Sequence, residues 1–250
     1  MNILTITRFE LKKLLKQRIV HASYILSCLI TVLFFLLNYI NRPADMYSGF
    51  SLIMDNLHVL NNILFMLPLI AIVLTVTSIS WEHSSGTLRT LLTRPIRREN
   101  IVIGKFLALL CIMCSLYYLI FMLTMILGLR WGYGGEFIVF IPRIFLIFLE
   151  YVLGTMIFVS LTGVIAFFVP NNLLALLLSL GLHRLWLMLD SIDQVNRYLF
   201  SYHISSITQL MMGNFIDYTD LFQSQIVILV YLLGIMLMLT TLWEKRDLQV

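Results

Sequence analysis

Three ionisable side chains stand inside long apolar stretches of this sequence, where a charge is costly. They are Glu150, His183 and Arg184. Groups of this kind at membrane depth form ion pairs, proton relays or ligand contacts. At about 1.5 Å per residue, Glu150 lies roughly 9 Å from the start of its stretch and Arg184 roughly 7.5 Å from the end of the next. The matching depths predict a Glu150–Arg184 ion pair. The alternative is that Arg184 extends alone toward the surface.

Motifs for hydrolysis or nucleotide binding do not accompany these charges. H-E-x-x-H and G-x-S-x-G are both missing from the sequence, so a metalloprotease or hydrolase site is unsupported. The G-x-x-x-x-G-K-S/T phosphate loop is missing too, so we expect no ATP site and no cofactor in this chain. We interpret His183 as a packed interior histidine rather than a proton relay. The three cysteines also lie in apolar stretches: Cys28, Cys111 and Cys114. We interpret them as packing residues.

The amino-acid composition predicts the kind of secondary structure that holds these residues. Hydrophobic residues make up 60% of the 250 residues and charged residues 12%. A soluble domain carries about 25% charged residues, so a soluble enzyme and a disordered chain are excluded. The apolar runs are long and unbroken, which favours helices over a membrane barrel. We therefore expect an all-α polytopic membrane protein with a single transmembrane domain over residues 1–250.

Six stretches approach the ~20 apolar residues that a membrane-spanning helix needs. They are Ile19–Ile40, His58–Ile79, Ile101–Leu129, Ile144–Phe168, Leu173–Leu189 and Gln225–Trp243. The third is longer than necessary, and the fifth is short and interrupted by His183 and Arg184.

The distribution of Lys and Arg predicts the orientation. Residues 1–18 and the 80–105 connection carry five each, and the C-terminal tail carries two. The opposite side carries only Arg42, Arg130, Arg143 and Arg197. Because basic residues accumulate on the cytoplasmic side, both termini are expected in the cytoplasm. The basic balance thus reflects orientation, and no nucleic-acid partner is expected.

Residues 1–18 have the pattern of an amphipathic helix lying on the membrane surface before the first span. Leu4, Leu11, Leu14 and Leu15 recur at helical spacing on one face. The basic residues of this elbow helix, placed to meet lipid phosphates, are Arg8, Lys12, Lys13 and Lys16. The alternative is an ordinary basic start that only orients the first span.

The cytoplasmic loop at residues 81–100 predicts a second short surface helix. Ser84 or Ser85 can cap it, because a serine hydroxyl accepts from a first-turn N–H. Apolar residues at i, i+3 and i+4 follow: Leu88, Leu91 and Leu92. Pro95 then ends the helix. A basic loop alone would explain the arginines but not this capped leucine pattern.

These residues resemble the signature E-x-x-x-G-T-L-x-x-L-L-x-x-P-I-x-R-x-x-x-x-x-G-K of bacterial ABC exporter permeases of the type-2 class. The matching positions are Glu82, Gly86, Thr87, Leu88, Leu91, Leu92, Pro95, Ile96, Arg98, Gly104 and Lys105. The resemblance implies that Glu82, Thr87–Leu92 and their neighbours contact a separate ATP-binding subunit and transmit its closure. It also implies two such ATPase subunits that bind ATP and Mg, a second permease copy or sister permease, and a bacterial inner (cytoplasmic) membrane.

Residues 190–224 form the longest predicted extracytoplasmic segment. Aromatic and methionine residues mix there with four aspartates. The segment exceeds an ordinary connection, so we expect helical turns packed in the outer leaflet. The acidic outer side weakly favours cationic or amphipathic cargo, although any interfacial helix pair needs an aromatic surface.

The leading function is therefore the membrane half of an ATP-driven exporter of hydrophobic or amphipathic cargo such as a peptide, an antibiotic or a lipid. One alternative is an ATP-driven assembly or maturation factor that serves an extracytoplasmic partner. The other is a secondary transporter, which would need ionisable groups converging near the midplane or two related halves with broken helices.

Overall fold

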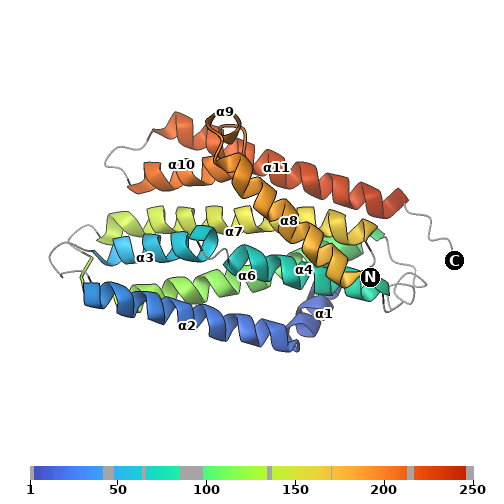
Figure 1. Ribbon diagram of the computed structural model, residues 1–250, viewed down its shortest axis with the longest axis horizontal. Helices are drawn as coiled ribbons and strands as arrows, with labels where there is room; N and C mark the ends of the chain where they lie inside the picture. The colour runs from blue at the N-terminus through green and yellow to red at the C-terminus, as the bar shows by residue number, and fades with distance from the viewer. Residues whose placement is uncertain are drawn as a thin grey trace.

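The chain folds into one elongated bundle of helices (Figure 1). This computed structural model describes residues 3–41, 48–63, 66–84, 98–133, 137–169, 171–212 and 217–245. The elements are α1 (Ile3–Leu15), α2 (Arg18–Asn41), α3 (Gly49–His58), η2 (Val59–Ile63), α4 (Met66–Ser84), α6 (Arg98–Gly128), α7 (Phe137–Phe168), α8 (Asn172–Asp190), α9 (Asp193–Asn196), α10 (Phe200–Met212) and α11 (Tyr218–Lys245). Strands are absent from these described ranges, which confirms the all-α prediction.

Five of the described helices are long and apolar enough to cross a bilayer, namely α2, α6, α7, α8 and α11. A sixth crossing arises if the bent pair α3–α4 counts as one, with 46° between Gly49–Asn61 and Met66–Ser80. The predicted continuous second span from His58 to Ile79 is therefore wrong. Asp55 and Asn56 interrupt the apolar pattern just before His58, so the span was predicted to start at the end of α3 rather than at its beginning.

Helix α7 lies at the centre of the bundle and the other spans surround it. In its most apolar window 67% of residues are buried, compared with 22% in α2 and 17% in α8 and α11. Helices α4, α6, α8, α10 and α11 all contact α7. The outer helices expose leucine-rich faces, for example Leu29, Leu177 and Leu233. An apolar face open to the surroundings suits lipid contact, in line with a multi-pass membrane protein.

The helix ends form two distinct regions. Helix α1, the end of α4 and the end of α11 lie together at one end of the bundle (Figure 1). A small apolar cluster closes that end, where the rings of Phe167 of α7 and Trp243 of α11 meet at 48°, with 5.6 Å between their centroids. Helix α8 runs obliquely across α7 and ends part of the way along it, and α10 then continues toward the opposite end beside α7 and α11 (Figure 1).

The helical turns predicted within residues 190–224 are confirmed by α9 and α10. They pack into the bundle, because Phe200, Ile204 and Ile207 of α10 are buried. Two predicted bounds were close, since α2 and α8 differ from them by one residue at each end. Helices α6, α7 and α11 begin three to seven residues earlier than predicted, because polar residues at their starts do not interrupt the helix.

Candidate functional site

The predicted coupling segment lies between the end of α4 and the start of α6. Glu82 belongs to the last turn of α4 and Arg98 is the first residue of α6, although neither side chain is described. The other predicted coupling residues lie outside the described residues: Gly86, Thr87, Leu88, Leu91, Leu92 and Pro95. The structure therefore places the two helices that carry this segment.

A buried ion pair joins the elbow helix to both of those helices. The Lys105 ammonium of α6 donates to Glu10 Oε1 of α1 at 3.0 Å and to the Ser78 carbonyl oxygen of α4 at 3.1 Å. Lys105 and Glu10 are each only 2% exposed. A buried charge is tolerated when it is paired and hydrogen-bonded, as it is here. One ammonium group thus ties α1, α4 and α6 together.

Gly104 lets α1 approach α6 closely enough for this pair to form. A Cβ at Gly104 would lie 2.6 Å from Ile6 Cγ2 and 3.0 Å from Ile6 Cβ, too close for any other residue to fit without a shift. Ile6, Glu10 and Leu14 form the buried face of α1 at i, i+4 and i+8. We call Ile6, Glu10, Ser78, Gly104 and Lys105 the elbow junction.

The predicted basic face of α1 is placed away from the bundle. Arg8, Lys12 and Lys16 are exposed, while Lys13 is half-buried with its ammonium 3.9 Å from Glu10 Oε2. Burial and the nearby Lys105 charge lower the pKa of Lys13, and Glu10 partly opposes them. The leucines of α1 divide between two surroundings. Leu4 and Leu15 are exposed, as a face in contact with lipid would be, whereas Leu14 is buried with Ile6 and Glu10 on the side that meets α6.

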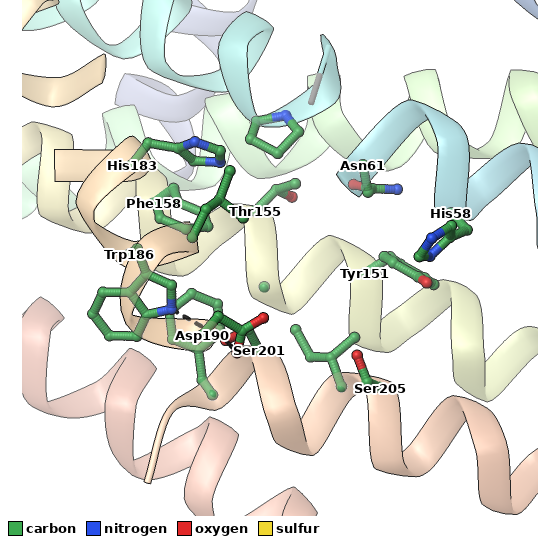
Figure 2. Close-up of a pocket in the computed structure, with 15 residues that line it drawn as sticks. His58, Asn61, Tyr151, Thr155, Phe158, His183, Trp186, Asp190, Ser201 and Ser205 are labelled. Carbon is green, nitrogen blue, oxygen red and sulfur yellow. Dashed lines mark hydrogen bonds between the residues drawn. The ribbon is translucent and has the colours of Figure 1, made fainter. Parts of the chain in front are cut away.

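A cavity of about 290 Å³ lies deeper in the bundle, between the α3–α4 bend, α7, α8 and α10 (Figure 2). Its deep end is formed by buried residues, including Thr155, Phe158 and His183. His58 and Ser205 are exposed and mark its mouth between α3 and α10. We call this space the α8–α10 cavity.

One wall of the cavity is aromatic. Phe200 lies 4.7 Å from Trp186 and 5.3 Å from Phe158, and Phe158 lies 4.6 Å from His183, between ring centroids. A relay of hydrogen bonds continues this wall. Trp186 Nε1 donates to Ser201 Oγ at 3.2 Å, and Ser201 Oγ donates to Asp190 Oδ1 at 2.8 Å (Figure 2). The relay fixes one carboxylate beside the rings.

A polar pair stabilises the bend that forms the opposite wall. Tyr117 of α6, fully buried, donates from its hydroxyl to Asn61 Oδ1 at 2.5 Å, and Asn61 Nδ2 donates to the Leu57 carbonyl oxygen at 2.9 Å. Asn61 lies in the π-helical turn η2. Such turns are frequent at functional sites. The bend beside the cavity is therefore held by specific side-chain contacts.

Comparison with known families gives the chain its class. The family model described as ABC-2 family transporter protein matches residues 4–248, which is nearly the whole chain. The chain belongs to this family. It is a permease, the membrane component of an ABC transporter, and this class works with a separate ABC ATPase. No curated protein sequence matches it significantly.

The permease does not place its two predicted intramembrane charges together. Gln225 Nε2 of α11 donates to Glu150 Oε1, while Arg184 lies on an exposed part of α8. The prediction of a Glu150–Arg184 pair is therefore replaced by a Glu150–Gln225 hydrogen bond. The depth estimate failed because α7 begins at Phe137, which puts Glu150 about 20 Å into the helix rather than 9 Å.

His183 of the permease is buried, as expected for a packed interior histidine, and it also lines the α8–α10 cavity. The sequence did not single out Glu10 or the cavity residues Asp190 and Trp186. An acid within the i, i+4, i+8 stripe of α1 would have pointed to Glu10. Among the described residues, no group of three or more His, Cys, Asp or Glu could hold a metal ion.

Proposed function

We propose that this permease forms the transmembrane half of an ATP-driven exporter in the cytoplasmic membrane of a bacterium. In this proposal, both termini are cytoplasmic and hydrophobic or amphipathic cargo moves outward. Two ATPase subunits bind ATP and Mg, and a second copy of the chain or a sister permease completes the pathway. The family match supports the class, and the excess of Lys and Arg in residues 1–18 and 80–105 supports the orientation.

The observation that carries the coupling role is the elbow junction. Lys105 binds α1 to the two helices, α4 and α6, that flank residues 85–97. A displacement of that segment by an ATPase subunit would move α4 and α6, and the buried pair would move α1 with them. Because packed interfaces switch between discrete arrangements, such a movement would rock the bundle between inward-open and outward-open states.

Transport by the assembled complex tests this function. The permease is co-expressed with a candidate ABC ATPase that co-purifies with it, and ATP-dependent uptake of fluorescent amphipathic peptides and cations is measured in inside-out vesicles. We expect Glu82→Ala to abolish most uptake while the permease remains inserted and the ATPase remains active. Glu244→Ala, an exposed acid near the end of α11, serves as the matched control and should transport normally.

Two results would contradict the proposal. One is full ATP-dependent uptake by the Glu82→Ala complex, which would remove the coupling role of this segment. The other is purification of the permease without any ATPase and uptake that continues without ATP, which would favour a secondary transporter. Absence of ATP-driven uptake, together with an extracytoplasmic protein that fails to assemble or mature, would favour the assembly-factor alternative.

A further inference from the structure

The α8–α10 cavity is enclosed by one chain, so a ligand could bind it without a second permease copy. Its walls come from η2, α4, α7, α8 and α10, all belonging to the same subunit. A cavity of about 290 Å³ is near the lower end of the ~300–1,000 Å³ typical of small-molecule sites. Its occupant is therefore a small molecule, or the head of a larger one.

The charge of the cavity lining favours a cation. The described residues that line it include one carboxylate, Asp190, and no lysine or arginine. Ser201 already occupies Asp190 Oδ1, and a ligand would meet the other carboxylate oxygen. A carboxylate in a partly enclosed, largely apolar space attracts a cation more strongly than it would in water.

The aromatic wall selects the type of cation. Phe158, Trp186 and Phe200 form a continuous group of rings, with Trp186 linked to Asp190 through Ser201. Aromatic faces bind weakly hydrated ammonium groups, and quaternary ammonium ligands are recognised through such faces. A hydrated metal ion would gain little from such rings and lacks the oxygen ligands it needs.

We propose that the α8–α10 cavity binds small organic cations in which an ammonium head is joined to an apolar body. The head would lie in the cavity beside Asp190, and the body would extend toward Phe158 and Thr155. The same chemistry exists in dissolved amines and in the ammonium headgroups of membrane lipids. Binding of such cations does not depend on the proposed export function. Their identification as cargo does rest on that function.

Equilibrium binding of radiolabelled benzyltrimethylammonium tests the site. The full chain is placed in phosphatidylglycerol nanodiscs without any ATPase, and the amount of probe bound by empty discs is subtracted. We expect saturable binding that Asp190→Asn weakens at least tenfold. Asp220→Asn, an exposed acid in the first turn of α11, is the matched control and should bind as the unaltered chain does.

A second variant keeps the test informative if Asp190→Asn fails to fold. Ser205 is exposed at the mouth of the cavity, and Ser205→Phe would fill that mouth without changing the carboxylate. We expect it to abolish saturable binding while the protein elutes normally on size exclusion. A neutral competitor of the same shape, neopentylbenzene, should displace the probe at least tenfold less well than unlabelled benzyltrimethylammonium.

The binding results distinguish a lipid headgroup, a dissolved cation and the absence of an ammonium site. Weaker probe binding in discs that contain phosphatidylethanolamine identifies the lipid headgroup as an occupant, and equal binding identifies a dissolved cation; both support the ammonium site. Equal binding by the unaltered chain, Asp190→Asn and Ser205→Phe would overturn the proposal, as would equal displacement by neopentylbenzene. Because the assay contains no ATPase and no transport step, a negative result leaves the export function to its own test.

Discussion

The elbow junction and the α8–α10 cavity hold their charged side chains in opposite ways, fully buried in the first and partly exposed in the second. At the junction, Lys105 and Glu10 neutralise each other and Ser78 supplies a further acceptor, with no room for a methyl group at Gly104. In the cavity, Asp190 has a hydroxyl partner and open space beside it. A matched and tightly packed contact transmits displacement, whereas an incompletely filled polar space accepts a ligand. The comparison separates a mechanical region from a binding region.

The largest effect is expected at the junction. Lys105→Met leaves Glu10 buried without its main partner, which should lower the free energy of unfolding by about 3–5 kcal/mol. The measurement is SDS-induced loss of helical circular dichroism in detergent. Lys12→Met, at an exposed lysine of α1, the helix that carries Glu10, is the control and should change little. Recovery in Glu10→Met/Lys105→Met would support the pair, and equal loss in both lysine variants would argue against it.

Two glycine-to-alanine substitutions, one in each region, should differ in their cost to stability. Gly104→Ala presses a methyl group against the Ile6 Cβ and Cγ2 atoms, so we expect a loss of about 2–3 kcal/mol from overpacking. The added methyl group of Gly154→Ala is close to Ile204 Cδ1, at 2.4 Å, the end of a flexible side chain beside the cavity, while Ile204 Cγ1 and Phe200 Cε2 lie at an ordinary 3.9 Å. It should cost less than about 1 kcal/mol, since Ile204 can rotate into open space. Equal costs in thermal unfolding would show that the two regions are equally rigid.

The contact that holds the bend should give a smaller effect. Tyr117→Phe removes the hydroxyl that donates to Asn61 Oδ1 and leaves a buried acceptor without that donor. We expect a loss of about 1–2 kcal/mol. Tyr118→Phe is the control, because Tyr118 is 56% exposed on the same helix. Apparent melting temperatures of the two variants provide the measurement, and a Tyr117→Phe protein as stable as Tyr118→Phe would contradict a stabilising role for the pair.

The smallest effect is expected where α8 begins. Asn171 caps this helix by accepting from the backbone N–H groups of Leu173 and Leu174 at 3.0 and 3.2 Å. Asn171→Ala should cost about 1 kcal/mol, and Asn171→Ser should retain most of the stability. If fraying of α8 reaches the cavity, benzyltrimethylammonium binding would fall in the alanine variant alone. Identical stability of the two variants would exclude the cap as a contributor.

The sequence predicted the helical class and the positions of most spans because lipid-facing helices need long apolar runs. It also separated α1 from α2, since basic residues at Lys12, Lys13 and Lys16 interrupt the apolar pattern. It could not predict that Glu10 meets Lys105, because 95 residues separate them and no local pattern encodes the contact. Glu150 was assigned the wrong partner because its depth depended on the start of α7. The cavity is lined by residues of α3, η2, α4, α7, α8 and α10, and the periodicity within a single helix does not show which helices come together.

The oblique course of α8 has a consequence for the surrounding bilayer. With 19 residues α8 is about 28 Å long. A helix of that length crosses the ~30 Å hydrocarbon core only if its axis is close to the bilayer normal. Because it is tilted and ends part of the way along α7, the non-helical backbone around Ser191 and Ile192 falls short of the far end of the bundle. Lipid tails cannot hydrogen-bond peptide groups, and here the chain supplies the partners itself, because the Ser191 and Ile192 N–H groups donate to the Met188 and Leu189 carbonyl oxygens at 3.3 and 3.1 Å. Because α8 is short for its tilt, we expect the leaflet at that end of the bundle to be thinned beside α8 and α10, so that the bilayer around the permease is uneven in thickness.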